Sequence, residues 1–240
     1  MKRYCNQMAT LYLIPNTLGE CALESVLPAG NTQIIKEIKH FIVEDVRTAR
    51  RFLKLVDKQI DIDSLSFYTL NQHTDTTMVG SYLDPIKDGA DVGIISEAGC
   101  PAVADPGADV VAIAQKRGYK VVPLVGPSSI LLSVMASGFN GQSFAFTGYL
   151  PINENERQKT LKKMETRIYT ESQTQIFIET PYRNNKLLEQ LIRYCQPATK
   201  LCIAYGITTA DEIIRTKSIA EWKKSMPKLD KIPCIFLLYK

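Results

Sequence analysis

The sequence predicts an α/β protein whose first half contains a parallel sheet. Along the 240 residues, short apolar runs alternate with segments of helical periodicity, which is typical of strands joined by helices. Two of these runs, Val92–Ile95 and residues 119–122, are each followed by a loop of small residues, Gly and Pro, and then by a helical segment. Open α/β sheets bind ligands at the carboxyl ends of parallel strands, so these two loops also predict a binding site.

The first half is predicted to alternate strand and helix from residue 11 onward. Asn31 or Thr32 can cap the first helix, and Gly89 marks the end of the third. Asp105 offers another N-cap, with Pro106 in the first turn that follows. The expected strands are residues 11–14, 41–43, 66–70, 92–95 and 119–122, and the expected helices are residues 31–39, 46–54, 76–88, 106–116 and 128–136.

Turn-forming residues at positions 137–141 predict a boundary between two domains. The first domain is expected to span residues 1–140 and the second residues 141–240. In the second half, Ser218 is expected to cap the helix that contains Trp222. The other elements expected there are strands 144–148, 174–178, 200–205, 212–216 and 234–239 and helices 155–166 and 185–194. Each domain is thus expected to contain a mixed or mostly parallel sheet flanked by helices.

The composition is that of a globular protein, with 45% hydrophobic and 22% charged residues, enough to build a hydrophobic core. The longest apolar run near the C-terminus, residues 234–239, is too short to span a bilayer. The N-terminal residues lack the apolar region and cleavage site of a signal peptide. We therefore expect a cytoplasmic protein that does not enter membranes.

The six cysteines and two histidines do not predict a metal site. No cysteine pair has the spacing of a zinc knuckle, and His40 and His73 lie far in sequence from a second plausible ligand. Cys100 has no histidine positioned by sequence to activate it as a nucleophile. We expect reduced cysteines and no bound metal.

The formal net charge of +4 permits RNA binding without requiring it. Basic residues recur at helical spacing after Glu44 and Asp45, at Arg47, Arg50, Arg51, Lys54 and Lys58. Such a run is usually a solvated helix face, but beside a ligand cleft it binds phosphates. Both alternatives stay open, and Arg47, Arg50 and Arg51 are the candidate RNA-binding residues.

Several nucleotide-binding and hydrolase motifs are absent from the sequence. It contains no Gly-x-Gly-x-x-Gly, so a dinucleotide-binding Rossmann domain is disfavoured. It also contains no Walker loop, no Gly-x-Ser-x-Gly elbow and no kinase motif. A cleft lined by small residues and backbone suits a nucleoside ligand better than a polyphosphate.

Seven collinear segments resemble one known family. The segments are residues 11–19, 44–47, 96–107, 123–129, 136–138, 144–151 and 178–183. Together they resemble the ribosomal RNA small-subunit methyltransferase I family, which are 2'-O-ribose methyltransferases of the tetrapyrrole methylase superfamily. The resemblance implies a two-domain fold with a ligand cleft between the domains, S-adenosylmethionine as methyl donor, and ribosomal RNA or the small ribosomal subunit as partner.

The resemblance also implies a set of residues that contact the donor. They are Pro15, Ser96, Glu97, Ala98, Gly99, Val103, Ala104, Ser128, Ser129, Glu179, Ala204 and Pro233. The alternative for Val103, Ala104 and Ala204 is packing in the core. For Ser128 and Ser129 it is a helix N-cap, which is compatible with donor binding.

A ribose 2'-hydroxyl is a poor nucleophile, so a base or an anion-stabilising group would assist the reaction. The candidates are Glu44, Glu179 and Arg183. Glu44 also suits the N-terminus of a helix, where acidic residues favour the dipole. Arg183 is equally consistent with a phosphate ligand and with a surface residue.

The sequence departs from the family pattern at several positions. Glu97 replaces Asp, Cys100 replaces Thr, Val125 replaces Pro and Tyr182 replaces His, and a basic residue is missing from residues 206–209. These departures keep two alternatives open: a methylase of a small tetrapyrrole-like or other metabolite, and a donor-binding protein without turnover.

The resemblance implies a homodimer, and one helix agrees with it. Leu131, Leu132, Val134 and Met135 give that helix almost no polar face, so it must be buried on every side. Burial against the chain's own second domain is the alternative to burial against a partner.

Overall fold

The computed structural model describes residues 9–71, 74–75 and 77–240. Cys5, His73 and Thr76, which entered the metal and helix predictions, lie outside these residues. The chain divides into two compact units, the first ending at Pro127 and the second beginning at Ser128. Each unit contains one five-stranded sheet, which confirms the predicted α/β class.

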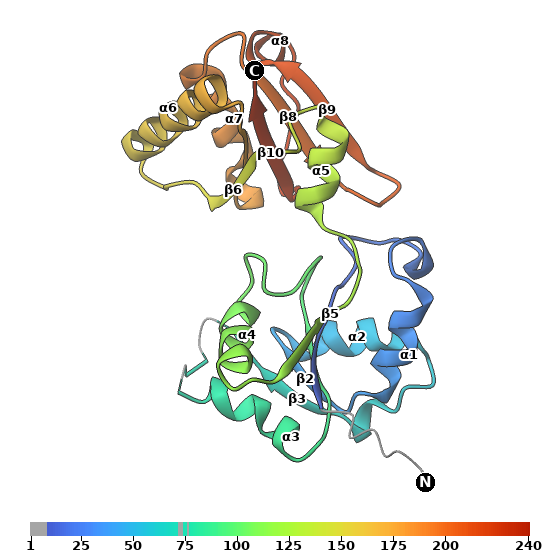
Figure 1. Ribbon diagram of the computed structural model, residues 1–240. Coiled ribbons are helices and arrows are strands. Elements are labelled where there is room, and N and C mark those ends of the chain that lie inside the picture. Colours follow the sequence, from blue (N-terminus) through green and yellow to red (C-terminus); the bar gives the residue numbers. More distant parts are fainter. Residues whose placement is uncertain (1–8, 72–73, 76) are drawn as a thin grey trace. The chain divides into compact units, whose positions relative to one another are not determined.

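The first unit is a parallel sheet covered by helices on both faces (Figure 1). Its strands are β1 (Thr10–Ile14), β2 (His40–Val43), β3 (Ser66–Thr69), β4 (Val92–Ile95) and β5 (Lys120–Pro123), and its helices are α1 (Ala29–Glu37), α2 (Val46–Val56), α3 (Asp84–Lys87) and α4 (Gly107–Lys116). Short 3₁₀ turns occur at Leu23–Ser25, Ile62–Ser64 and Val79–Leu83. The strand order is β3-β2-β4-β1-β5.

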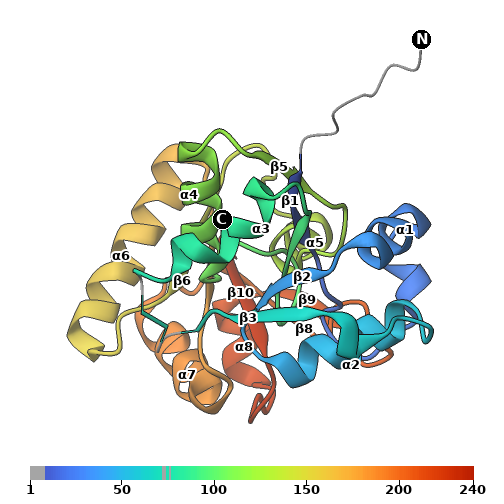
Figure 2. The same cartoon turned by 90° about the horizontal axis from the view of Figure 1, so that it is seen from below.

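Alternation along the strands supplies the two cores of this unit. On β2, Phe41 and Val43 pack with residues of α1 and α2, whereas Ile42 packs with residues of α3 and α4 on the other face. Close packing favours glycine at position 93 of β4, because a Cβ there would lie 2.6 Å from the Ile14 side chain. Figure 2 shows the same unit from below, with the helices arranged around the sheet.

The prediction of one continuous helix in the first unit was wrong. Residues 76–88 were expected to form a single helix, but the structure has the 3₁₀ turn Val79–Leu83 followed by the short α3. Pro85 explains the difference, because proline has no N–H to donate to the carbonyl one turn earlier, as a continuous helix would require. Pro85 therefore occupies the first turn of a new helix and ends the preceding one.

The second unit is built on a mixed sheet. Its strands are β6 (Phe144–Tyr149), β7 (Thr174–Ile178), β8 (Lys200–Tyr205), β9 (Ile213–Ser218) and β10 (Cys234–Tyr239), and its helices are α5 (Ser129–Ser137), α6 (Glu154–Glu171), α7 (Asn184–Tyr194) and α8 (Ile219–Lys224). A 3₁₀ turn occurs at Pro181–Arg183. The strand order is β6-β7-β10-β8-β9; β6 and β7 are parallel, and the other pairs are antiparallel. Ser218 caps α8 as predicted, in a capping box with Glu221.

The division between the units differs from the boundary expected at residue 140. Helix α5 packs against β9 and β10 of the second sheet. The hydroxyl of Thr216 on β9 also donates a hydrogen bond of 2.8 Å to the Ser137 carbonyl at the end of this helix. Residues 128–140 therefore belong to the second unit, because their contacts are there, whereas the turn formers at 137–141 merely join α5 to β6.

Within the described residues, no helix has the length and apolar character needed to cross a membrane.

Candidate functional site

The carboxyl ends of four neighbouring strands bring the predicted residues of the first unit to one sheet edge. Glu44 follows β2, Ser96 follows β4, Pro15 follows β1, and residues 124–127 follow β5. Because the four strands are parallel neighbours in the order β2-β4-β1-β5, these positions lie side by side. The two small-residue loops predicted from the sequence are both part of this edge, where backbone N–H groups are accessible to a ligand.

The loop after β4 is held by the carboxylate of Asp105. One oxygen accepts hydrogen bonds from the backbone N–H groups of Ala102 (3.2 Å) and Gly107 (2.7 Å), and the other accepts one from the Ser96 hydroxyl (3.0 Å). Ala102 and Ala104 have left-handed backbone angles, with φ of 63° and 55°, which cost about 1 kcal/mol or more per residue outside glycine. Asp105 thus fixes the loop in a strained conformation.

The loops after β1, β4 and β5 are tied to each other. Asn16 and Gly99 exchange two backbone hydrogen bonds of 3.0 and 3.2 Å, and Gly99 needs its positive φ of 70° for this approach. Gly126 packs directly on Pro15, because a Cβ at position 126 would lie 2.2 Å from the proline ring. The Asn31 side chain donates to the Val125 carbonyl at 2.8 Å. The loops therefore form a single connected surface of small residues.

Glu44 lies in a carboxylate-rich part of this edge. Burial, the charge of Asp105 and a hydrogen bond to Asp105, and then the charge of Glu97, raise the pKa of Glu44 from 4.5 to about 7. Glu44 and Asp105 also line a small cavity of about 10 Å³, which is near the size of one water molecule. The edge thus contains a carboxyl group that changes charge near neutral pH.

The first turn of α2 contacts the predicted donor loop. Asp45 caps α2 by accepting the Thr48 N–H at 2.8 Å, and the Thr48 hydroxyl donates to Glu97 at 2.7 Å. Arg47 in this first turn and Arg50 and Arg51 in the next are exposed. Arg50 lies over the ring of Phe67, 5.6 Å from its centre. No ion pair within the described residues involves these three arginines.

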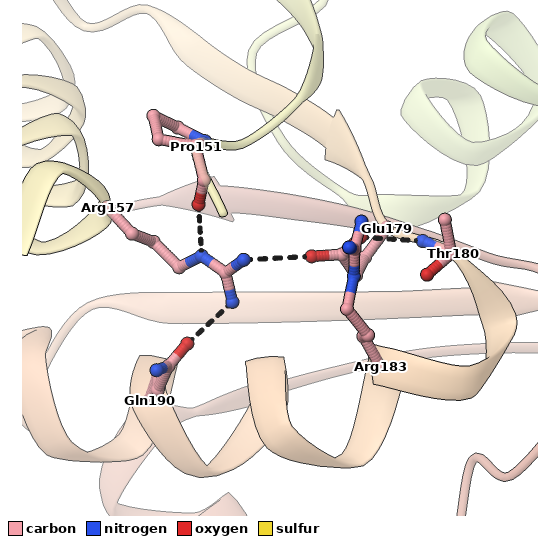
Figure 3. Close-up of polar contacts among 6 residues, drawn as sticks. All are labelled: Pro151, Arg157, Glu179, Thr180, Arg183 and Gln190. Atoms are coloured by element: carbon pink, nitrogen blue, oxygen red, sulfur yellow. Dashed lines mark hydrogen bonds and ion pairs between the residues drawn. The ribbon is translucent and has the colours of Figure 1, made fainter. Parts of the chain in front are cut away.

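In the second unit, Glu179 is the centre of a buried charge network (Figure 3). One of its oxygens accepts from Arg157 at 3.0 Å. The other accepts from Arg183 at 2.6 and 2.9 Å and from the Thr180 N–H at 2.8 Å. Arg157 is in turn held by the Pro151 carbonyl and the Gln190 side chain. With both oxygens engaged, Glu179 acts as an organising anion rather than as a free base.

The other predicted donor contacts of this unit fall into two places. Ala204 is the second-last residue of β8 and Pro233 precedes β10, and the strand register places both at the end of the sheet that Glu179 follows. Ala204 is buried, whereas Pro233 is exposed. Ser128 accepts the Leu131 N–H as the N-cap of α5, and Ser129 begins that helix. The N-cap expected as an alternative role for Ser128 is present.

Val103 and the residues that depart from the family pattern are mostly at the surface. Val103 is 49% exposed, so it is not a core residue. Val125 and Tyr182 are also largely exposed. Cys100 donates to the Pro127 carbonyl at 3.5 Å, and burial raises the pKa of its thiol, which disfavours a nucleophilic thiolate. The described part of the chain contains no cluster of three potential metal ligands.

Sequence reasoning missed two residues that organise the site. Asn16 follows Pro15 directly, but its pairing with Gly99 depends on strand order, which the local sequence does not reveal. Arg157 had a signal: it lies four residues before Leu161 and seven before Met164, on the buried face of α6. A basic residue in phase with an apolar stripe predicts a buried ion pair.

Comparisons with known proteins agree with this architecture. The model of the family described as tetrapyrrole (corrin/porphyrin) methylases matches residues 26–223. A ribosomal RNA small subunit methyltransferase I of Vibrio cholerae is 27% identical over 216 residues, which are 90% of this chain and 71% of the relative. Another, of Halalkalibacterium halodurans, is 30% identical over 183 residues, which are 76% of this chain and 59% of the relative. The crystal structure of the methyltransferase CobJ shares the fold, with a TM-score of 0.64 and 16% identity, over 97% of this chain and 93% of that one.

Proposed function

We propose that this chain, which belongs to the tetrapyrrole (corrin/porphyrin) methylase family, transfers a methyl group from S-adenosylmethionine to a ribose 2'-hydroxyl of small-subunit ribosomal RNA. Membership rests on a family model that matches most of the chain, and it makes the protein a methyltransferase. The observation that carries the choice of substrate is the similarity to relatives named ribosomal RNA small subunit methyltransferase I over as much as 95% of the chain. Ribosomal RNA as substrate implies a cytoplasmic site of action.

The sheet edge of the first unit fits the proposed donor. When bound, S-adenosylmethionine supplies a methyl group on a positively charged sulfur. Ser96, Ala98 and Gly99 have small side chains or none, so a ligand can approach their backbone groups, and Gly126 packs on Pro15 in the neighbouring loops. The carboxyl groups of Glu44, Glu97 and Asp105 favour a cationic ligand at this edge. Ser128, Ser129, Glu179, Ala204 and Pro233 remain the donor contacts proposed for the second unit.

Glu44 is our candidate for the proton acceptor. S-adenosylmethionine, when bound, would supply the methyl group and leave as S-adenosylhomocysteine, and the Glu44 carboxylate would accept the proton that the ribose hydroxyl loses. A base with a pKa near the working pH is the most effective, and the pKa of Glu44 is raised to about 7. Asp105 is a positioning residue in this scheme. Glu179 is a poorer candidate because its oxygens already accept hydrogen bonds from two arginines.

The second candidate function is methylation of a small tetrapyrrole-like metabolite. The family model is named for corrin and porphyrin methylases, and the fold is similar to that of a protein described as the methyltransferase CobJ. The third candidate function is that of a donor-binding protein without turnover, which is suggested by the missing basic residue in positions 206–209.

The test uses small ribosomal subunits from a strain that lacks the gene. The purified protein and tritiated S-adenosylmethionine should label the 16S RNA, and the labelled position should resist alkaline cleavage, as a 2'-O-methylated nucleotide does. Calorimetry with S-adenosylhomocysteine measures donor binding independently. Donor binding without label in RNA would overturn the RNA proposal and leave the two alternatives, whereas no donor binding would overturn the choice of donor.

A further inference from the structure

A cavity separate from the candidate site lies in the second unit, lined by β8, β9, α8 and the loop after α8. Figure 1 shows these elements together at one end of the unit. The cavity has a volume of about 140 Å³ and apolar walls that include two basic side chains. The lining residues used below are Ile203, Tyr205, Arg215, Lys217, Trp222 and Met226, and we call this cavity the β9 pocket. None of them is among the predicted donor contacts.

The register of β8 and β9 explains why apolar and basic groups meet here. Ile203 lies opposite Arg215 in the antiparallel pair, and directly opposed residues project from the same face. Lys217 follows Arg215 by two residues, so it lies on that face as well. Arg215 is exposed and Lys217 is half-buried, so both basic side chains reach solvent.

Lys217 is fixed by its contact with Trp222. Its ammonium nitrogen lies 4.7 Å from the centre of the indole ring, within the range of a cation–π interaction. The ring is itself held, because its N–H donates to the Leu201 carbonyl at 2.8 Å. The cation therefore has a set position at the wall of the pocket without being neutralised.

Among the described residues, no carboxylate lies within ion-pair distance of Arg215 or Lys217, although hydrogen bonds from Ser218 and then the charge of Lys217 help to lower the pKa of Glu221. The nearby acid Glu221 is occupied by both the backbone N–H and the hydroxyl of Ser218. Residues 213–228 contain five basic side chains and one acidic one, so this stretch alone carries a formal charge as large as that of the whole chain.

The size of the β9 pocket limits its ligand. Sites for whole small molecules usually enclose roughly 300–1,000 Å³, so a pocket of about 140 Å³ accommodates one part of a larger ligand. Cations beside an apolar wall are the combination by which proteins bind single-stranded nucleic acid, with basic groups on phosphates and apolar groups against bases. A flexible anionic polymer meets both conditions.

We propose that the β9 pocket binds one nucleotide of a single-stranded segment of the RNA substrate, with Arg215 and Lys217 on its phosphates and its base against Tyr205 and Met226. This inference rests on the proposed function and adds an RNA contact in the second unit to the candidate RNA-binding arginines of α2. The pocket would fix which part of the RNA strand is held, not perform the reaction.

The test compares variants in binding a short fluorescein-labelled single-stranded RNA across a range of salt concentrations. Arg215→Ala/Lys217→Ala should weaken binding roughly tenfold or more at low salt and reduce the slope of log affinity against log salt by about 1.4, or 0.7 for each lost phosphate contact. Ser225→Trp, which fills the pocket and keeps the charge, should weaken binding with little change in slope. The single variant Arg215→Ala keeps the Lys217–Trp222 contact, so weaker RNA binding in this variant would not be due to the loss of that contact.

Lys162→Ala/Lys163→Ala is the matched control, because it removes the same charge from exposed positions on α6. A slope equally reduced in this control, or unchanged in the pocket variant, would overturn the inference. Polyglutamate serves as a probe for an acidic protein partner. If the pocket variant lost binding to polyglutamate but bound RNA as the wild type does, the inference would also be overturned, and the pocket would be assigned to an acidic protein. If ribosomal subunits are methylated normally by the pocket variant and RNA binding is unchanged, only this inference fails. If the wild type neither binds nor methylates RNA, the proposed function fails with it.

Discussion

A carboxyl group titrates near neutral pH only when its surroundings oppose its charge, as those of Glu44 do. Because the pKa of Glu44 is raised from 4.5 to about 7 by burial and by Asp105, the folded state holds this proton more tightly than the unfolded state. The stability that Glu44 contributes is therefore fully present below pH 4.5 and is lost as the pH rises through about 7.

We expect Glu44→Gln, which keeps the side chain neutral, to raise the thermal unfolding temperature at about pH 8 and to have little effect at about pH 4. Thermal unfolding of both proteins at the two pH values measures this. Glu189→Gln is the control, because Glu189 is exposed on α7; it should show no such pH-dependent gain. An equal effect of Glu44→Gln at both pH values would contradict the raised pKa.

The same carboxyl group predicts how methyl transfer depends on pH. If Glu44 accepts the proton, the rate should rise with pH up to about 7 and then level off, because only the carboxylate is a base. Glu44→Gln should lower the rate roughly 100-fold or more and remove this dependence, with donor binding retained. Single-turnover assays across pH provide the measurement, and an unchanged profile in the variant would exclude Glu44 as the base.

The network around Glu179 predicts a loss of stability when one partner is removed. Arg157 and Glu179 are both almost fully buried, so Arg157→Leu should lower the free energy of unfolding by about 1–3 kcal/mol, since one oxygen of Glu179 loses its partner while Arg183 still pairs with the other. Urea unfolding measures the change. Adding Glu179→Gln to this variant should recover part of the loss, and a loss below about 1 kcal/mol for Arg157→Leu would contradict the network.

At this scale, the sequence predicted residues better than their partners. Glu44, Ser96 and Glu179 were selected because they lie in motif segments, and their functional roles stay predictions. The contact between Glu44 and Asp105 was not predicted, because it requires β2 and β4 to be neighbours. Neighbouring strands are set by the packing of the whole unit, and a motif read along the chain contains no such information.

Among the elements of the site, the loop after β5 depends most on a single small residue. Gly126→Ala would place a methyl group 2.2 Å from the ring of Pro15, so the loop has to move away from β1. We expect a loss of about 1–3 kcal/mol in the free energy of unfolding and weaker binding of S-adenosylhomocysteine. Urea unfolding and calorimetry measure the two effects. Gly141→Ala is the control, because its new methyl group would have only an ordinary contact at 3.7 Å.

Helix α2 carries the three arginines that are candidates for RNA binding. If Arg47, Arg50 and Arg51 face phosphates, changing all three to Ala should reduce the salt dependence of RNA binding by roughly 0.7–0.9 for each contact and spare donor binding. Salt titrations of RNA binding measure the slope. An unchanged slope would identify these residues as a solvated helix face, the alternative that their spacing also allows.

The accuracy of the predicted elements follows their burial. Strand β4 is buried along its whole length, so its sequence is an uninterrupted apolar run and its bounds were predicted correctly. Residues 76–88 have a weaker pattern, and there the local effect of Pro85 decided the structure. Sequence patterns therefore locate elements that pack on both sides and fail where backbone chemistry interrupts them.

For the whole molecule, α5 supports the prediction of a homodimer. Leu131 and Met135 are 52% and 77% exposed on this helix, although Val134 is buried. The chain's own second unit thus covers only one side of α5. We expect sedimentation to give about twice the monomer mass of 26.9 kDa, and Leu131→Lys/Met135→Lys to give the monomer, because two charges would be buried at the interface. A wild-type monomer at micromolar concentration would contradict the prediction.

The position of β10 affects how this protein can be made. It is the last strand of the sequence but the middle strand of its sheet, buried between β7 and β8. Until it arrives, the strands already synthesised can form only two separate pieces, the parallel pair β6–β7 and the hairpin β8–β9, each with an open edge. The second unit therefore cannot fold stepwise as it emerges from the ribosome, and its edges stay exposed until residues 234–239 have left the exit tunnel.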